Sequence, residues 1–109
     1  MIEEVFTLSN FSEKRVDKVI QDDNLDYIHM IFNQDEGLPI HTANSNVYMT
    51  VLQGTLSIGL NEEKVKAYPA GTLLKIPYRT KMNVRNENPE TLALIVIKAP
   101  SPRTLQKNH

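Results

Sequence analysis

The sequence predicts an all-β domain of about ten short antiparallel strands, arranged as a small barrel or sandwich. Short apolar runs alternate with turn-forming residues through the middle and end of the chain, which is typical of all-β folds. No long amphipathic helix is visible. So many short strands leave exposed edges unless the sheets close, and a jelly-roll barrel closes them at this chain length.

The expected strands are the apolar runs that lie between turn-forming residues. They are Glu4–Leu8, Val16–Ile20, Asp26–Phe32, Pro39–His41, Val47–Gln53, Thr55–Leu60, Lys64–Ala67, Thr72–Ile76, Lys81–Asn86 and Thr91–Ile97. Between them, Asp22 and Asn61 begin polar runs that suit tight turns, because Asp and Asn side chains can bond the backbone nearby. Pro69 and Gly71 fit the second and fourth positions of a further turn.

Two segments depart from this pattern. Val16, Val19 and Ile20 stand at helical spacing after Ser12, so a short helix is an alternative to the strand there. Residues 101–109 are polar and follow Pro100, so an extended or disordered tail is expected. Residues 1–100 then form a single domain.

Composition excludes several classes of function. The 109 residues are enough for one domain, and the net charge of −1 with no basic run argues against a nucleic-acid partner. Cysteine is absent, which rules out disulfides and favours a reducing compartment. The chain shows no secretory signal and no apolar stretch of membrane-spanning length. We therefore expect a cytoplasmic protein without a membrane partner.

The stretch from Gly37 to Asn86 resembles the two motifs of small single-domain cupins. The first motif places a histidine, a second histidine two residues later, a glutamate four residues further and a glycine seven beyond that. Aligned from Gly54, the first three positions hold His41, Ala43 and Val47.

The second motif of the resemblance is carried mainly by its turn-forming residues. The cupin pattern is Gly, five residues, Pro, a nearby Gly, then His, three residues and Asn. Gly71, Pro77 and Asn86 match this pattern, whereas Arg79 replaces the second glycine and Met82 replaces the third histidine.

This resemblance implies a jelly-roll barrel in which the cupin metal set is reduced to His41. Three imidazoles and one carboxylate hold a divalent metal in the family. Ala43 and Val47 supply no donor atom, and the thioether of Met82 is a poor ligand for the harder divalent ions. A single imidazole does not hold such a metal tightly. We therefore expect neither a metal nor another cofactor.

The barrel interior is the expected ligand pocket. Strand alternation turns Val47 and Met49 inward. His41 either bonds a ligand or is a remnant at the barrel mouth, and His29 either faces the same cavity or lies on the outer face of its strand. Asn44 and Asn46 either recognise a polar ligand or form the loop before a strand. The candidate pocket residues are His29, His41, Ala43, Asn44, Asn46, Val47, Met49 and Met82.

These residues favour a non-enzymatic barrel that binds a small molecule of unknown identity. One alternative is an enzyme with weak metal-dependent or metal-free acid/base chemistry through His41, with or without His29. Another is a structural dimerisation module without a ligand. A homodimer is expected, because the apolar run Val5–Leu8 offers a strand that could pair across a twofold axis. Beside the inferred mouth, Arg79 and Lys81 either attract an anion or form a solvated turn.

Overall fold

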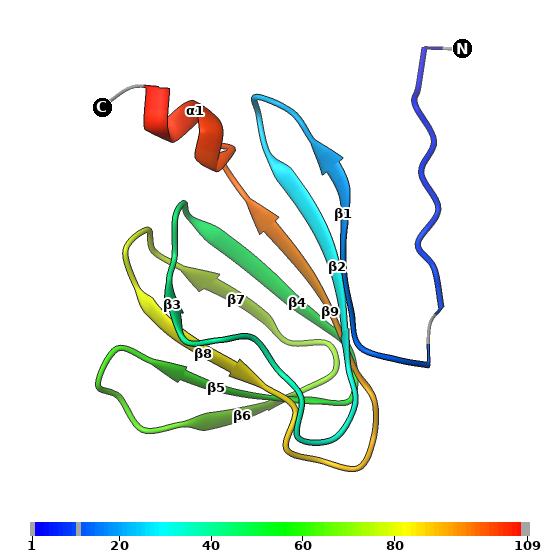
Figure 1. Ribbon diagram of the computed structural model, residues 1–109, viewed down its shortest axis with the longest axis vertical. Helices are drawn as coiled ribbons and strands as arrows, with labels where there is room; N and C mark the ends of the chain where they lie inside the picture. Colours follow the sequence, from blue (N-terminus) through cyan, green and yellow to red (C-terminus); the bar gives the residue numbers. More distant parts are fainter. Residues whose placement is uncertain (1, 11, 108–109) are drawn as a thin grey trace.

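The computed structural model describes residues 2–10 and 12–107 and confirms the all-β jelly-roll prediction. Within these residues, nine strands form two sheets that face each other, and one short helix follows the last strand (Figure 1). The elements are β1 (Arg15–Gln21), β2 (Asp26–Phe32), β3 (His41–Thr42), β4 (Val47–Gln53), β5 (Thr55–Leu60), β6 (Lys66–Pro69), β7 (Leu73–Ile76), β8 (Lys81–Arg85), β9 (Leu92–Lys98) and α1 (Pro102–Lys107). Apart from Glu4–Leu8, the expected strands are present with ends that shift by at most two residues.

The two sheets draw their strands from both ends of the chain. One sheet has the order β1-β2-β9-β4-β7 and the other the order β3-β8-β5-β6. All paired strands run antiparallel. Because β9 lies between β2 and β4, the end of the chain completes the larger sheet.

Alternating side chains from both sheets form the core. In β4, Val47, Met49 and Val51 are at most 1% exposed, whereas Leu52 on the other face is 47% exposed. This is the period of two predicted for a strand with one face in the interior. Buried residues of the opposite sheet, such as Leu56 and Val84, belong to the same cluster.

Asp22 and Asn61 support their turns in different ways. The Asp22 Oδ1 atom accepts hydrogen bonds from the backbone amides of Asn24 and Leu25, at 2.8 and 3.1 Å, in the β1–β2 turn. Asn61 has a positive φ of 51° at the end of β5, and its side-chain oxygen accepts a bond from the Lys81 amide at 3.0 Å. Both hairpins expected at these sites are present.

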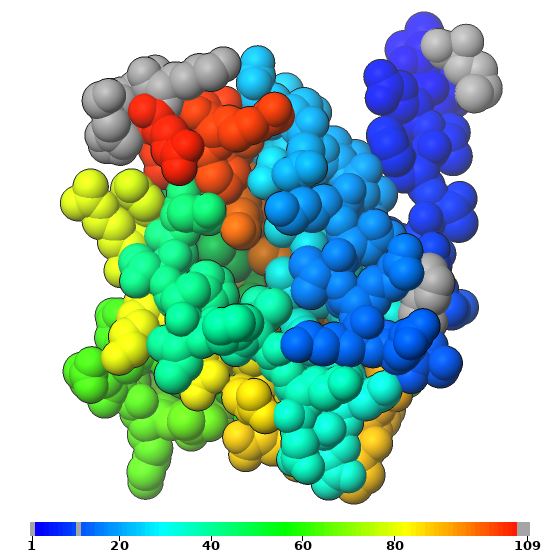
Figure 2. Space-filling model, viewed as in Figure 1, coloured from blue at the N-terminus to red at the C-terminus, as the bar shows by residue number. Residues whose placement is uncertain are grey.

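The N-terminal prediction was wrong for one strand and correct for the next. Residues 2–10, which we call the N-terminal arm, form no strand, and the arm stands to one side of the barrel (Figures 1 and 2). An alternating sequence shows that a segment suits a strand, but it does not show whether a sheet edge is available to pair with that segment. Val16–Ile20 lies within β1, so the helical alternative there is wrong.

The tail prediction was wrong for residues 102–107, which form α1. Pro102 occupies the first helical turn, where its missing N–H is not needed, and the Ser101 carbonyl accepts a bond from the Leu105 amide at 3.1 Å. The Thr104 hydroxyl donates to the Asp23 carbonyl at 2.6 Å, which docks α1 on the β1–β2 turn. Residues 108 and 109 lie outside the described residues. In the described part of the chain, no helix is long and apolar enough to cross a membrane.

Candidate functional site

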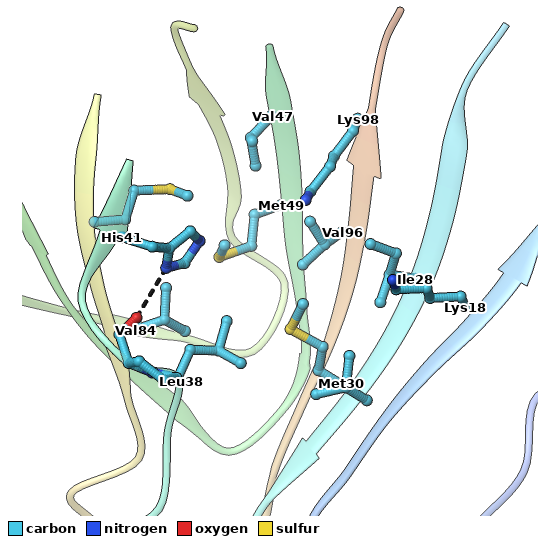
Figure 3. Close-up of a pocket in the computed structure, with 13 residues that line it drawn as sticks. Lys18, Ile28, Met30, Leu38, His41, Val47, Met49, Val84, Val96 and Lys98 are labelled. Atoms are coloured by element: carbon cyan, nitrogen blue, oxygen red, sulfur yellow. Dashed lines mark hydrogen bonds between the residues drawn. The ribbon is translucent and has the colours of Figure 1, made fainter. Parts of the chain in front are cut away.

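A cavity of about 270 Å³ lies between the inner faces of the two sheets. Strands β1, β2, β4, β8 and β9 contribute inward side chains, and β3 and the loop before it form another wall (Figure 3). The lining is mostly aliphatic and thioether. The lining residues are Val16, Lys18, Ile28, Met30, Leu38, Pro39, His41, Val47, Met49, Met82, Val84, Val96 and Lys98.

The mouth of the cavity lies where β1 approaches the loop before β3. Val16 is 42% exposed, and Lys18 and Pro39 are also exposed, although all three line the cavity. Deeper lining residues such as Val47 and Val84 are fully buried. The cavity is therefore a pocket with an apolar interior and an accessible rim.

His41 presents one ring nitrogen to this pocket. Its Nδ1 atom lies 2.9 Å from the Pro39 carbonyl oxygen. A carbonyl can only accept a hydrogen bond, so Nδ1 carries the proton and donates it. In the neutral ring, Nε2 then keeps a free lone pair. Figure 3 shows the imidazole turned toward the pocket, so His41 can accept a hydrogen bond from a molecule held there.

Two lysines give the pocket a positive charge. Lys98 is the last residue of β9, its side chain is partly buried, and its nitrogen points into the cavity (Figure 3). Burial lowers the pKa of Lys98; Asp26, its direct neighbour on β2, opposes this effect, and the nearby charge of Lys18 adds to it. Lys18 reaches the pocket from β1.

Four of the eight residues expected in the pocket line this cavity: His41, Val47, Met49 and Met82. His41 and Met82 are direct cross-strand neighbours in the β3–β8 pair, and Val47 and Met49 come from β4 on the facing sheet. The structure therefore brings three of the four positions aligned with cupin ligands to one cavity.

Three other expected pocket residues belong to the surrounding framework. Ala43 is 2% exposed and packs in the core cluster without lining the cavity. Asn44 is exposed to solvent. The side chain of Asn46 donates to the Ala99 carbonyl at 3.3 Å and accepts from the Tyr78 amide at 3.2 Å. Asn46 thus joins two loops and is oriented by the backbone.

His29 lies on the opposite face of β2 from the cavity. Its neighbours Ile28 and Met30 both line the cavity, and strand alternation directs His29 away from it. It is 6% exposed and pairs in register with Asp17 of β1. Burial lowers the pKa of His29, and the charge of Asp17 partly opposes this. The interpretation that His29 and His41 share one site is therefore wrong.

Lys18, Lys98 and most of the apolar lining were not predicted from the sequence. In β9, Leu94, Val96 and Lys98 share one face by alternation, and this pattern places a cation at the C-terminal end of an apolar stripe. Arg79 and Lys81, for which the alternatives were attraction of an anion and a solvated turn, do not line the cavity. Lys81 instead forms an exposed ion pair with Glu62 at 3.8 Å.

The aligned cupin ligand positions do not fit a divalent metal. Within the described residues, no three His, Cys, Asp or Glu side chains gather at one place. Val47 is 0% exposed and Ala43 is 2% exposed within the apolar core, and neither has a coordinating atom. His41 is the one nitrogen donor in the set, which is too few for tight divalent binding.

Arg79, which stands where the second cupin motif has a glycine, has a backbone conformation that suits glycine. Arg79, at the position of the motif glycine, has a positive φ of 72°. This left-handed conformation favours glycine. The Arg79 guanidinium lies over the Tyr78 ring at 5.0 Å. The turn therefore has a conformation that glycine favours, although the residue there is arginine.

Comparison with known proteins identifies the fold. No protein-family model matches the chain. An RmlC-like cupin family protein with a double-stranded β-helix fold, from Methanocaldococcus jannaschii, superposes with a TM-score of 0.93 and 28% identity, over 97% of this chain and 98% of that one. The chain has the fold of a small cupin domain. The same archaeal protein, the uncharacterised MJ0764, aligns in sequence over 106 residues, which are 96% of this cupin and 91% of MJ0764.

More distant structures share the fold alone. The cupin domain of Cnp3 from Schizosaccharomyces pombe superposes with a TM-score of 0.76 at 10% identity, over 94% of this cupin and 75% of that chain. TT1209 from Thermus thermophilus superposes with a TM-score of 0.74 at 21% identity, over 88% and 91% of the two chains. The resemblance that the two motifs carried is confirmed at the level of the fold.

Proposed function

We propose that this cupin is a non-enzymatic module that binds a small molecule in the cavity between its sheets. The observation that carries the proposal is an apolar cavity that reaches the surface and has a few polar groups at its rim, which is the usual form of a ligand site. Its volume of about 270 Å³ is just below the ~300–1,000 Å³ range of ligand pockets, so the ligand is small.

The side chains around the cavity support binding more than catalysis. Only one of the four positions aligned with cupin ligands keeps a side chain that binds the harder divalent metals, and His29 lies on the other face of β2. The enzyme alternative would therefore depend on His41 alone. We infer that the metal set has been lost and that the apolar cavity has taken over its space. The cytoplasmic location and the absence of a nucleic-acid partner stay predictions.

Hexanol, a small amphipathic alcohol, tests this proposal. A ligand that binds only the folded state adds about 1.4 kcal/mol of stability at ten times its dissociation constant. Because each kcal/mol raises the melting temperature of a small domain by roughly 4–8 °C, the effect is measurable by calorimetry. Val84→Phe should fill the cavity and abolish the hexanol-dependent increase in melting temperature, whereas the same change at the exposed Val65 should leave it intact. An increase that survives Val84→Phe would place hexanol elsewhere and contradict the proposal.

We also propose that the cupin forms a homodimer through its N-terminal arm. In the arm, Ile2 is 104% exposed, Val5 72% and Phe6 49%. Figure 2 shows the arm projecting beyond the body of the molecule. Apolar side chains on an extended segment without a strand partner favour pairing with a second copy.

Light scattering at micromolar concentration tests the dimer directly. The full chain should have the mass of two copies, and a variant without residues 1–10 should have the mass of one. As a control for general loss of apolar surface, Leu73→Ser removes an exposed leucine of β7 and should leave the mass unchanged. A monomeric full chain would overturn this second proposal without affecting the first.

A further inference from the structure

We propose that the ligand is a small monoanion, a carboxylate with a short apolar tail, whose charge lies between Lys18 and Lys98. This inference rests on the proposed function and specifies the chemistry of the ligand. Lys18 on β1 and Lys98 on β9 lie on either side of β2 in the larger sheet, and both line the cavity. No Asp or Glu is among the lining residues. The tail would occupy the apolar interior, and the carboxylate would face the two ammonium groups.

The charges around this end of the cavity leave room for one anion. Asp26 is paired with Lys98 in the β2–β9 register and is 7% exposed. Ser101 donates a hydrogen bond to its Oδ1 atom at 3.4 Å. Two ammonium groups opposed by one carboxylate leave a single positive charge. Among the described residues, neither lysine forms a direct ion pair, so a bound carboxylate would be the partner that balances this charge.

The partial burial of Lys98 makes such a partner favourable. A cation removed from water loses hydration energy, and a nearby carboxylate restores part of it. Burial is the main cause of the lowered pKa of Lys98, and Lys18 contributes in the same direction. An anion bound at this position would relieve both effects. Lys18 is exposed at the rim, where it can attract the anion before it enters.

The same charges argue against a soft metal cation. Met30, Met49 and Met82 line the cavity together with His41, and thioether and imidazole ligands are suited to Cu(I). Two lysines in the same cavity would repel that cation, and the lining provides no carboxylate to offset the repulsion. The methionines are therefore better explained as adaptable apolar walls around the tail of a ligand.

Hexanoate, hexanol and hexylamine are matched probes for this inference, because they share one tail and differ in charge. By calorimetric titration, hexanoate should bind about tenfold more tightly than hexanol. One hydrogen bond to a charged group lowers a dissociation constant by about tenfold or more. Hexylamine should bind most weakly. Raising the salt concentration should weaken hexanoate binding and leave hexanol binding nearly unchanged.

Variants of single lysines locate the charge. Lys98→Met and Lys18→Met keep side chains of similar length, and each should remove most of the preference for hexanoate. Lys75→Met, on the outward face of β7 in the same sheet, is the matched control and should change nothing. Hexanol binding should persist in all three variants, which shows that each remains folded with its cavity intact.

The outcomes separate this inference from the proposed function. If hexanol binds in the cavity as tightly as hexanoate, the inference fails and the proposed function stands. A preference for hexanoate that survives both Lys98→Met and Lys18→Met would also overturn the inference. If neither probe binds, both proposals fail. Should a lysine variant not fold, the salt dependence of hexanoate binding in the native protein decides the question.

Discussion

His29 couples the stability of this cupin to pH. The imidazole is buried on the outer face of β2, and burial lowers its pKa. In the unfolded chain its pKa is about 6.5. As the pH falls below that value, the unfolded state takes up the proton before the folded state does. The stability that the neutral imidazole provides is therefore complete above about pH 6.5 and is lost as the pH falls toward the folded pKa.

Replacing His29 by Gln should remove this part of the pH dependence. Urea unfolding of the native protein should give a lower free energy of unfolding at about pH 5.5 than at about pH 7.5, on either side of the ordinary histidine pKa. In His29→Gln the difference between the two values should be smaller, because the other titrating groups are unchanged. Equal differences in the two proteins would show that His29 does not cause the effect.

The four positions aligned with the cupin ligands should accept a rebuilt metal set. Ala43→His, Val47→Glu and Met82→His together with His41 would restore the four cupin donors, on β3, β4, β8 and the loop after β3. Without metal, the new polar groups in the core should lower the free energy of unfolding by about 2–4 kcal/mol. Zn²⁺ should restore this loss by mass action, as a melting experiment would measure.

The control for this variant is His41→Ala in the same background, which should weaken the metal-dependent rise. A folded triple variant that neither binds Zn²⁺ nor gains stability from it would show that these positions are not equivalent to the cupin ligands.

Single residues were predictable where a motif or a strand pattern constrained them. His41, Val47 and Met82 were identified from the motifs, and all three line the cavity. Lys98 was not predicted, because whether its side chain reaches the cavity depends on how β9 inserts between β2 and β4. Nothing local to the sequence shows that insertion. The face occupied by His29 likewise depended on a register that only the folded sheet reveals.

At the scale of elements, the β4–β5 turn depends on Gly54. This residue has a positive φ of 77°, and a Cβ atom there would lie 2.4 Å from the Thr91 carbonyl oxygen. Gly71 also has a positive φ, 92°, but a Cβ atom there would meet nothing within 4 Å. An alanine at Gly71 would therefore introduce backbone strain alone, whereas an alanine at Gly54 would introduce backbone strain and steric overlap.

Alanine substitutions should show this difference. Gly71→Ala should lower the free energy of unfolding by about 1 kcal/mol through left-handed strain. Gly54→Ala carries the same strain and also forces the β4–β5 turn away from Thr91, so its cost should be about 2–4 kcal/mol. Urea denaturation measures both values. Equal losses would mean that the turn moves freely away from the Thr91 carbonyl.

Elements were predictable where local chemistry decided them. The hairpin at Asp22 follows from a side chain that bonds the nearby backbone, and the hairpin at Asn61 follows from an asparagine in the left-handed conformation. The alternating burial of β4 follows from its alternating sequence. The N-terminal arm and α1 were mispredicted because tertiary partners decide them. Residues 4–8 have a strand pattern but no hydrogen-bonded edge, whereas α1 is held by the Thr104 bond to Asp23 in a distant turn.

At the scale of the whole molecule, the cavity exists because small and flexible apolar side chains line it from both sheets. Val47, Val84 and Val96 are short, and Met30, Met49 and Met82 are flexible. The barrel was predictable because many short strands need closure, but the size of the space left inside it was not. That space depends on how all the lining side chains pack together.

The most direct test of ligand binding in the cavity is to observe the methionine methyl groups by nuclear magnetic resonance. Met30, Met49 and Met82 lie on β2, β4 and β8 around the cavity, so a bound molecule must contact several of them. In protein with isotope-labelled methionine methyls, hexanol should shift these three resonances together with one dissociation constant, and Val84→Phe should abolish the shifts. Resonances that stay unmoved at saturating hexanol, or that move equally in Val84→Phe, would contradict the account.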